Sequence, residues 1–514
     1  MIGPQRSGKT VNVISGILDW DGPAILFSVR DDLYQATFAR RNAVGTCFVF
    51  DPLNSLPDLH PEAVRVGWSP LQAAGTVPGA QRVAAYLLEA SPMEGTTNAN
   101  YFERKGEALL WPILYAAAIG DKSMADVVQW LAVQDGTDIE TDPDGVQRRT
   151  GAVREILTEA ITLDPGGVGG KQASHALAQF DGFWKLDART RSDIYSTSQT
   201  LVQPWEDPFV SYSSALGHRH GQVGAGIDLE LLLTGRNTLY VAQPIEDVKR
   251  YAVVFGGVLG PLLKDQAYRA AHQYRQPLPD MLVVIDEAGN TPFQWLPSVA
   301  STCSGIGVLL VTVWQSKAQI DAIYQTQADP LLTNHGSKIF FAGASDEATL
   351  KYVSYLAGEE EVHMRTASAD VNLSANRRSL NDATSQRRLL PAELLRQVEP
   401  GDGLLIHGTL PPAHIRSRRY WADGRLQRLA AGHGEDLADW VMDDDLRSAL
   451  STQLAPTAEV LAHLPDYDPT GGIASTEALA DEPGRGGDLD PMPSGMSLGW
   501  GSETNETGPG ITWS

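Results

Sequence analysis

The sequence predicts an α/β fold with a mostly parallel central sheet, an inserted all-α domain, and a disordered acidic C-terminal tail. A glycine-rich octapeptide at residues 3–10 leads directly into a helical pattern. Short runs of β-branched residues alternate with helical stretches on both sides of a long middle region, whereas that region has helical periodicity throughout. The end of the chain is rich in Pro, Gly, Ser, Asp and Glu and shows no sustained periodicity.

These changes of pattern place the expected domain boundaries. We expect a first core segment at residues 1–78, the inserted domain at 79–205, a second core segment at 206–428 and the tail at 429–514. Residues 435–514 hold 16 Asp and Glu against two Arg, so the tail carries most of the net charge of −23. The tail either keeps the protein soluble or docks on a partner.

The composition excludes several classes of protein. With 42% apolar residues in 514, the chain has enough apolar side chains for a large core and is neither fibrous nor wholly disordered. Cys47 and Cys303 are too few for a disulfide scaffold and suit a reducing compartment. The longest apolar stretches, 109–119 and 306–314, are shorter than the roughly 20 residues of a membrane-spanning helix. We therefore expect no transmembrane segment, and the charged residues soon after Met1 predict no signal peptide.

The octapeptide fits the pattern G-x-x-x-x-G-K-[ST] at every fixed position, and this pattern predicts a phosphate-binding P-loop for ATP. Its residues are Gly3, Pro4, Gln5, Arg6, Ser7, Gly8, Lys9 and Thr10. The two glycines let backbone N–H groups converge on phosphate oxygens. Lys9 is expected to pair with the β- and γ-phosphates, and the Thr10 hydroxyl to bind Mg²⁺. The run 11–18 then continues as a helix whose N-terminus faces the phosphates.

A second acidic site is expected where a buried strand ends. Residues 281–285 are apolar and mostly β-branched, which is typical of a central parallel strand, and Asp286 and Glu287 follow directly. Asp286 is a candidate to hold Mg²⁺, and Glu287 to orient or deprotonate the attacking water. A further strand at 307–314 ends at Gln315, which is either a γ-phosphate sensor or an ordinary strand-end residue. Other strands are expected at 24–29, 46–50, 238–242, 338–342 and 403–407.

Only Met1 and Ile2 precede Gly3, although a P-loop normally follows a buried strand of about five or six residues. We therefore expect the natural chain to begin upstream of Met1.

The inserted domain is expected to contain six helices, at 81–90, 101–118, 124–133, 152–163, 172–180 and 189–202. Aromatic and basic residues in it are candidates for stacking on single-stranded DNA, and helix packing is the alternative explanation for them. They are Tyr101, Phe102, Arg104, Lys105, Phe183, Trp184, Lys185, Arg189 and Arg191. The segment His218-Arg219-His220 lacks further metal ligands at suitable spacing and predicts a surface loop.

The chain resembles the type IV secretion coupling proteins, which are TraG/TraD-like conjugative DNA-transfer ATPases. The resemblance covers roughly residues 1–425. Its most specific part is VVIDEAGN, GVLLVTVWQSKAQIDAIY and LLTNHGSKIFFAGASDEATLKYVS, at 283–354. Weaker parts are RRLLPAELL, GDGLLIHGTLPP, NANYFERKGEALLWPILYAAA and TRSDIYSTSQTLVQPWEDP.

The resemblance implies a RecA-like ATPase core in a hexameric ring, which uses ATP and Mg²⁺ to move single-stranded DNA and its relaxase to a membrane secretion channel. It implies that Lys9 and Thr10 are the P-loop pair, Asp286 and Glu287 the acidic pair, and Gln315 the sensor. It also implies a location at the cytoplasmic face of the inner membrane. The chain departs from the family by lacking N-terminal membrane helices before the P-loop.

A second departure concerns the arginine that many members carry before the sensor strand, because this chain has Ser-Thr-Cys-Ser-Gly at 301–305. Arg416, Arg418 and Arg419 are weak candidates for an arginine finger. Two other functions stay open. One is an FtsK-like DNA translocase, although no C-terminal winged helix follows the core. The other is a non-hydrolysing adaptor that recruits cargo, against which the intact Lys9, Asp286 and Glu287 speak.

Overall fold

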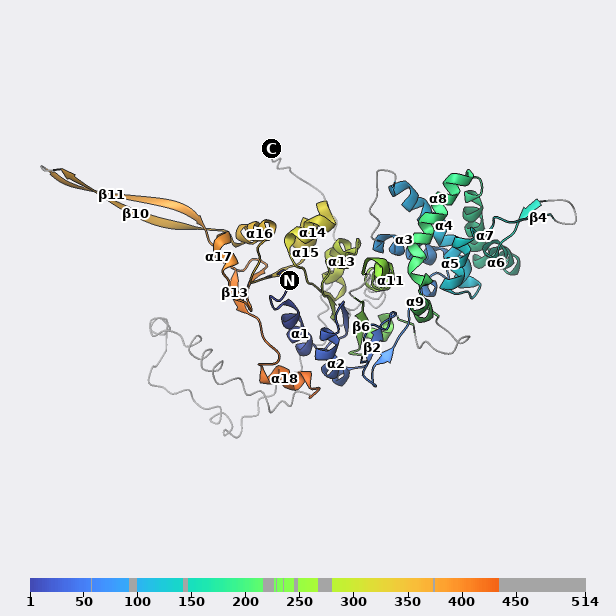
Figure 1. Ribbon diagram of the computed structural model, residues 1–514, viewed down its shortest axis with the longest axis horizontal. Coiled ribbons are helices and arrows are strands. Elements are labelled where there is room, and N and C mark those ends of the chain that lie inside the picture. Colours follow the sequence, from blue (N-terminus) through green and yellow to red (C-terminus); the bar gives the residue numbers. More distant parts are fainter. Residues whose placement is uncertain are drawn as a thin grey trace, which may run out of the picture. The chain divides into compact units, whose positions relative to one another are not determined.

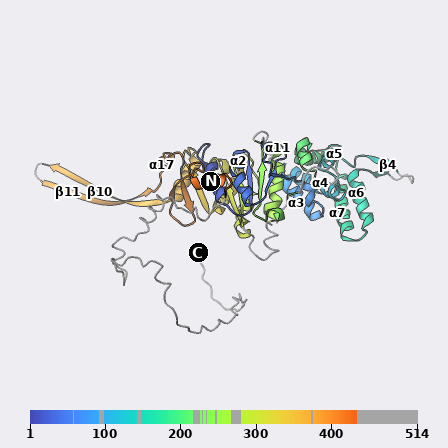
Figure 2. The ribbon, with the colours of Figure 1, turned by 90° about the horizontal axis from the view of Figure 1, so that it is seen from below.

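A computed structural model gives the fold, and it describes residues 1–433 apart from 57, 92–98, 142–146, 216–225, 228, 234, 245–247, 267–279 and 373–374. Figures 1 and 2 show these residues as coloured ribbons. Two predictions, the tail beyond residue 433 and the loop at 218–220, lie outside the described residues. Within the described residues, no helix combines the length and the apolar character needed to cross a bilayer.

The central sheet has six strands in the order β3-β2-β6-β1-β7-β8, and every pairing is parallel. The strands are β1 (Ala24–Ser28), β2 (Cys47–Phe50), β3 (Val64–Arg65), β6 (Thr238–Ala242), β7 (Met281–Ile285) and β8 (Val308–Thr312). All residues of β1, β2, β6 and β7 are buried, as the continuous apolar runs predict for strands covered on both faces.

Successive side chains of these strands enter two different cores. Leu26 and Val284 pack with α1 (Lys9–Asp19) and α2 (Asp32–Val44) on one face. Phe27 and Ile285 pack on the other face with α11 (Val248–Gly260) and α13 (Leu296–Thr302). The alternation follows from the two-residue period of a strand, and it gives the predicted doubly wound core.

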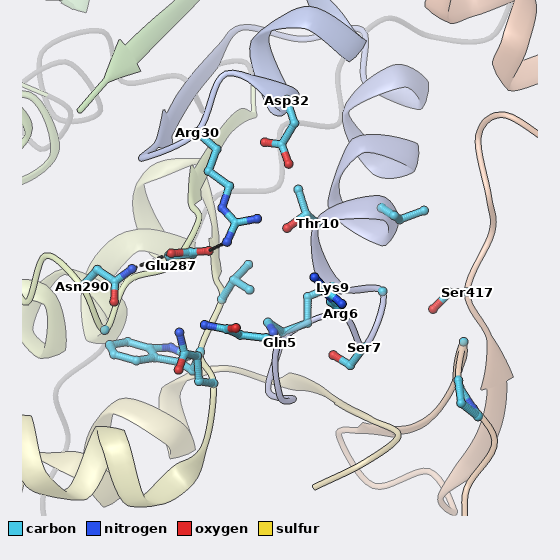
Figure 3. A pocket seen from close by; sticks show the side chains of 18 of the residues that line it. Gln5, Arg6, Ser7, Lys9, Thr10, Arg30, Asp32, Glu287, Asn290 and Ser417 are labelled. Carbon is cyan, nitrogen blue, oxygen red and sulfur yellow. Dashed lines mark hydrogen bonds and ion pairs between the residues drawn. The ribbon is translucent and has the colours of Figure 1, made fainter. Parts of the chain in front are cut away.

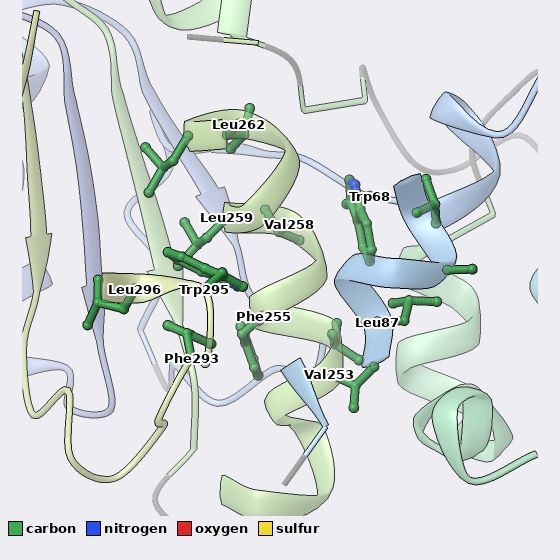
Figure 4. Close-up of a cluster of buried hydrophobic side chains, with 14 of the residues drawn as sticks. Trp68, Leu87, Val253, Phe255, Val258, Leu259, Leu262, Phe293, Trp295 and Leu296 are labelled. Atoms are coloured by element: carbon green, nitrogen blue, oxygen red, sulfur yellow. The ribbon is translucent and has the colours of Figure 1, made fainter. Parts of the chain in front are cut away.

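A close-up of the second core shows how the inserted helices join the sheet. In Figure 4, α11 lies between Trp68 and Leu87 on one side and Phe293 and Trp295 on the other. Glycines on α11 make this approach possible, because a Cβ at Gly257 would lie 2.7 Å from the Trp68 ring. The rings of Phe293 and Trp295 stack at 4.8 Å.

A second sheet adjoins the first and differs from the prediction. Its strands β9 (Ser337–Phe341), β12 (Asp402–His407) and β13 (Ala413–Arg416) pair antiparallel in the order β13-β12-β9. The expected strands at 338–342 and 403–407 are therefore present but do not belong to the parallel sheet. β12 and β13 are joined by a short connection, as antiparallel neighbours can be, whereas α16, β10, β11 and α17 lie between β9 and β12 in the chain.

Residues 1–3 lie between the two sheets. Ile2 bridges in parallel to Trp314, just beyond β8, and to Phe340 of β9. The Ile2 N–H donates to the Ile339 carbonyl at 2.8 Å, and the Gly3 N–H donates to the Trp314 carbonyl at 3.1 Å. The P-loop therefore starts at the carboxyl edge of the parallel sheet.

The inserted region contains all six expected helices, each within a few residues of its expected bounds. They are α3 (Val77–Ala90), α4 (Ala99–Ile119), α5 (Met124–Ala132), α6 (Ala152–Leu163), α7 (Val168–Phe183) and α8 (Ala188–Val202). The region is not all-α, because β4 (Ile139–Thr141) and β5 (Gln147–Arg149) form a small antiparallel hairpin. This hairpin was not expected from the sequence, since three-residue strands leave no measurable periodicity.

The remaining elements follow in chain order. The helices are α9 (Pro208–Ser213), α10 (Leu229–Leu233), α14 (Lys317–Tyr324), α15 (Ala328–Asn334), α16 (Glu347–Ala357), α17 (Ala392–Arg396) and α18 (Gly424–Ala430). Short helical turns lie at Pro70–Ala73, Gln203–Glu206, Pro261–Gln266, Cys303–Ile306 and Gln325–Gln327. A long antiparallel hairpin, β10 (Glu359–Asn372) with β11 (Ala375–Arg388), was not expected from the sequence (Figure 1).

Candidate nucleotide-binding site

The P-loop has the backbone conformation that its glycines allow. Gly8 precedes α1 with a φ of 96°, and Arg6 also lies in the left-handed region, with a φ of 60°. A Cβ at Gly3 would lie 2.7 Å from the Ser7 hydroxyl and 2.8 Å from the Phe341 Cβ, so only glycine fits there. The loop thus presents its backbone N–H groups at the N-terminus of α1, an arrangement that favours anions.

Lys9 is bound by its own loop. The ammonium donates to the carbonyls of Gly3 and Pro4, both at 2.7 Å, and the side chain is 9% exposed. Burial lowers the pKa of Lys9, while the carboxylates of Asp286 and Glu287 act in the opposite direction. The positive charge is therefore held inside the loop, close to two negative groups.

Thr10 and Asp286 meet, although 276 positions separate them in the sequence. The Thr10 hydroxyl donates to Asp286 Oδ2 at 3.4 Å. Asp286 is 1% exposed, and burial raises its pKa to about 6, with Glu287 and Asp32 adding to the shift. A hydroxyl beside carboxylates supplies the hard oxygen ligands that Mg²⁺ prefers.

Glu287 is held at the edge of the same site. It has a φ of 53°, which is uncommon for a residue with a side chain. Arg30, just beyond β1, places Nη2 3.3 Å from Glu287 Oε1, and the Asn290 amide donates to Oε2. Figure 3 shows both partners directed at the carboxylate. Both oxygens of Glu287 are therefore oriented by neighbouring side chains.

Gln315 follows β8 and lies on the same wall. Its backbone N–H donates to Gln319 Oε1 at 3.1 Å, and both residues line the cavity. A Cβ at Gly289 would lie 2.1 Å from the Gln319 amide, so Gly289 leaves room for this side chain. The acidic segment after β7 and the polar segment after β8 are thereby packed against each other.

These groups surround one cavity of about 510 Å³, which is within the size range of small-molecule sites. The sequence-predicted residues that line it are Gln5, Arg6, Ser7, Gly8, Lys9, Thr10, Glu287 and Gln315. Gly3, Pro4 and Asp286 do not line it directly but contact Lys9, Thr10 or Ser7 as described. The structure therefore brings the predicted set together at the carboxyl edge of the parallel sheet.

Sequence reasoning missed other residues of this cavity. Arg30, Asp32, Asn290, Gln319, Pro400, Gly401, Ser417 and Trp421 also line it, together with Arg419, which the sequence offered only as a candidate arginine finger. The position of Arg30 and Asp32 after an expected strand could have signalled them, because carboxyl ends of parallel strands share one edge. No local motif marks Pro400, Gly401, Ser417 or Trp421 as cavity residues; they lie just before β12 and just after β13 of the antiparallel sheet.

The three candidate arginines have different surroundings. Arg416 pairs with Asp402 at 3.1 Å, and Arg418 pairs with Asp19 at 3.0 Å and with Asp423 at 2.8 Å. Among the three, only Arg419 lines the cavity, and this is the cavity of the same subunit and not that of a neighbour.

Three of the candidate DNA-stacking residues, Phe183, Trp184 and Arg191, pack within the inserted domain. Phe183 is 5% exposed and belongs to the core. The Trp184 ring lies 4.5 Å from the Arg149 guanidinium and 4.4 Å from that of Arg191. Helix packing therefore accounts for these side chains, whereas Tyr101 is 51% exposed with Lys105 near its ring.

The amino-acid sequence is similar to one protein family and to two VirD4 proteins. Residues 280–400 match a family described as the TraM recognition site of TraD and TraG. Protein VirD4 of Agrobacterium fabrum (strain C58 / ATCC 33970) is 21% identical over 447 residues, and Protein VirD4 of Rhizobium rhizogenes is 20% identical over the same length. Each match covers 84% of this chain, and the chain spans 59% of the length of each relative.

Solved structures of the coupling protein TrwB are similar in fold. The unbound form of the bacterial conjugative coupling protein TrwBdeltaN70 has a TM-score of 0.55 at 16% identity, covering 81% of this chain and 83% of that one. TrwB in complex with the ATP analogue ADPNP has a TM-score of 0.52 at 15% identity, and TrwB with ADP and Mg²⁺ has 0.50 at 16%. Both cover 81% of this chain and 84% of TrwB.

The TrwB-like fold agrees with the RecA-like core and helical domain expected from the sequence. The family match at 280–400 and the similarity to the VirD4 proteins agree with the resemblance to type IV secretion coupling proteins of the TraG/TraD type found in the sequence.

Proposed function

We propose that this protein is an ATP-driven motor that delivers single-stranded DNA, with its relaxase, to a type IV secretion channel during conjugation. One observation carries the proposal. Lys9, Thr10, Glu287 and Gln315, from three segments distant in sequence, meet around one cavity, with Asp286 directly behind Thr10. The similarity to VirD4 and TrwB supports the coupling role.

Each of these residues would have its own role in ATP hydrolysis. Lys9 would exchange its bonds to the Gly3 and Pro4 carbonyls for bonds to the β- and γ-phosphates. Thr10 and Asp286 would hold Mg²⁺, which neutralises phosphate charge. Glu287, oriented by Arg30 and Asn290, would position the attacking water and accept its proton. Gln315 would contact the γ-phosphate or that water.

Work on DNA requires more than one subunit in this proposal. Arg30 lies beside Glu287 but is already ion-paired with that carboxylate, so it is not expected to contact the γ-phosphate. In this proposal the arginine finger therefore comes from a neighbouring subunit. We propose a homo-hexameric ring at the cytoplasmic face of the inner membrane, through which the strand passes by its phosphates.

The test is steady-state ATP hydrolysis with and without single-stranded or duplex DNA. We expect DNA to stimulate turnover, Glu287→Gln to lower it roughly 10²- to 10⁴-fold with nucleotide still bound, and Lys9→Ala to lose nucleotide binding. Matched controls are Glu393→Gln and Lys351→Ala, at exposed positions outside the cavity. Normal turnover in Glu287→Gln would refute the motor.

The same variants separate the alternatives in a conjugation assay. A cargo-recruiting adaptor that does not hydrolyse ATP predicts unchanged DNA transfer in Lys9→Ala and Glu287→Gln at normal protein levels. The motor predicts that transfer is lost in both. An FtsK-like translocase instead predicts stimulation by duplex DNA over single-stranded DNA.

A further inference from the structure

The two ends of the cavity have different chemistry. The acidic pair and Gln315 mark the end where the terminal phosphate of a nucleotide belongs, because water must attack there. In Figure 3, Glu287 and Ser417 lie on opposite sides of the P-loop. The far wall consists of Pro400, Gly401 and the segment Ser417–Trp421, which follows β13. A nucleotide whose phosphates occupy the P-loop would direct its sugar and base toward this wall.

Ser417 carries an unsatisfied polar group at this wall. The residue is 7% exposed, and its hydroxyl has no hydrogen-bond partner in the described part of the chain. The hydroxyl lies 3.6 Å from the position of a Cβ at Gly8, directly against the P-loop. The buried hydroxyl of Ser7 is likewise without a partner. Because buried hydroxyls normally pair, two unpaired ones beside a phosphate loop indicate a polar ligand.

Arg419 and Trp421 complete the wall. Arg419 lines the cavity, and no carboxylate among the described residues pairs with it, in contrast to Arg416 and Arg418. Trp421 is 52% exposed, and its ring meets the Tyr420 ring edge to face at 5.1 Å. The wall therefore offers a cation and an accessible indole to whatever enters the cavity.

The wall is anchored to the P-loop helix. Tyr420 packs against a cluster in which Leu426 and Leu429 of α18 contact Ile14 and Leu18 of α1. Asp423 caps α18 and pairs with Arg418. Such anchoring fixes Trp421 relative to the loop, so that stacking on it costs little conformational entropy.

We propose that Ser417–Trp421 is the nucleoside-binding wall of the site: Trp421 stacks on the base, while Ser417 and Arg419 donate hydrogen bonds to the sugar-phosphate part of the nucleotide. This inference rests on the proposed nucleotide binding and extends it to three residues of the segment that follows β13. Aromatic stacking tolerates any base, because every base has a π-face.

The experiment compares two ligands by isothermal titration calorimetry on the full chain with Mg²⁺. ADP has a base, whereas inorganic tripolyphosphate has phosphates only. We expect Trp421→Ala to weaken ADP binding about 5- to 100-fold and to leave tripolyphosphate binding unchanged, since stacking contributes only to ADP. Trp421→Phe should retain most of the ADP affinity. Tyr355→Ala, which removes another exposed aromatic side chain that does not line the cavity, is the control.

The results separate this inference from the proposed function. Loss of both ligands in Lys9→Ala, together with unchanged ADP binding in Trp421→Ala, would support the P-loop site and overturn the nucleoside wall. Equal weakening of both ligands in Trp421→Ala, or a Trp421→Phe variant as weak as the alanine variant, would also overturn it. Failure of the unaltered chain to bind ADP would refute both proposals.

Discussion

Burial of Asp286 lowers the stability of the ligand-free fold when the carboxyl is charged, whereas the proposed binding of Mg²⁺ needs the charged form. The Asp286 pKa of about 6 in the folded chain, against an ordinary value of 3.8, means that folding favours the protonated form. The stability it contributes is therefore complete below pH 4 and is lost as the pH rises through 6. The difference of about two pKa units corresponds to about 3 kcal/mol. Above pH 6 the buried charged carboxylate destabilises the ligand-free fold, and a bound metal ion would offset this destabilisation.

The corresponding prediction concerns Asp286→Asn in ligand-free protein. At pH 8 the variant should be more stable than the unaltered chain by up to about 3 kcal/mol, because a neutral amide avoids the burial of charge. At pH 5 the gain should shrink, since Asp286 is then mostly protonated. Urea unfolding at both pH values measures the difference. The same gain at both values would contradict the assigned cause, and the variant should lose stabilisation by Mg²⁺ and ADP.

Gly289, in the segment after β7, leaves room for the Gln319 side chain from the segment after β8. In Gly289→Ala the new methyl group would displace the Gln319 amide, the free end of a flexible side chain. We expect a change in stability below about 1 kcal/mol but a clear fall in kcat, because the Gln319 bond to the Gln315 N–H is lost. Parallel measurement of ADP affinity, unfolding and turnover tests this. A fall in affinity without a change in kcat would count against the assigned role of Gln319.

At the scale of elements, α11 depends on glycine for its packing. A Cβ at Gly257 would lie 2.7 Å from the Trp68 ring and 3.1 Å from Leu87 of α3. Gly257→Val should therefore destabilise the protein by about 1–3 kcal/mol through overpacking. The urea midpoint of the ligand-free chain measures this loss.

A glycine in another helix gives the opposite expectation and serves as the control. Gly182 of α7 has no atom within 4 Å of its Cβ position. Gly182→Ala should raise the free energy of unfolding by up to about 1 kcal/mol, since alanine is the better helix former. Destabilisation in both variants would mean that glycine is needed for the helical backbone and not for the contact of α11 with α3.

At the scale of the whole molecule, the ring can be tested by mass. The Glu287→Gln variant, which should bind ATP without hydrolysing it, is expected to form a particle of about six times the 55.5 kDa chain mass when ATP and single-stranded DNA are present. Light scattering coupled to gel filtration measures this mass. A monomer under all conditions would exclude an arginine finger supplied by a neighbouring subunit.

The elements that the sequence predicted are those with a local signal. The strand at 238–242 and the helix at 152–163 have the expected bounds, because burial on both faces or on one face leaves a period in the sequence. The P-loop and the Asp286-Glu287 pair were recognisable because their spacing is fixed by phosphate geometry. The β10–β11 hairpin was missed, since its strands are largely polar and pair residues such as Glu359 with Arg388.

The P-loop, the acidic pair, the helices of the inserted region, the strands with apolar runs and the resemblance to coupling proteins were all recognisable from the sequence. The folded structure was needed to show which strands are antiparallel, that Arg30 and Asn290 hold Glu287, and that Ser417 and Trp421 line the same cavity as the P-loop. The physical reason is the range of the interactions. Helix and strand periods and loop motifs depend on neighbours in the chain, whereas the Arg30–Glu287 ion pair and the approach of Ser417 to Gly8 join segments separated by hundreds of residues through the packing of the core.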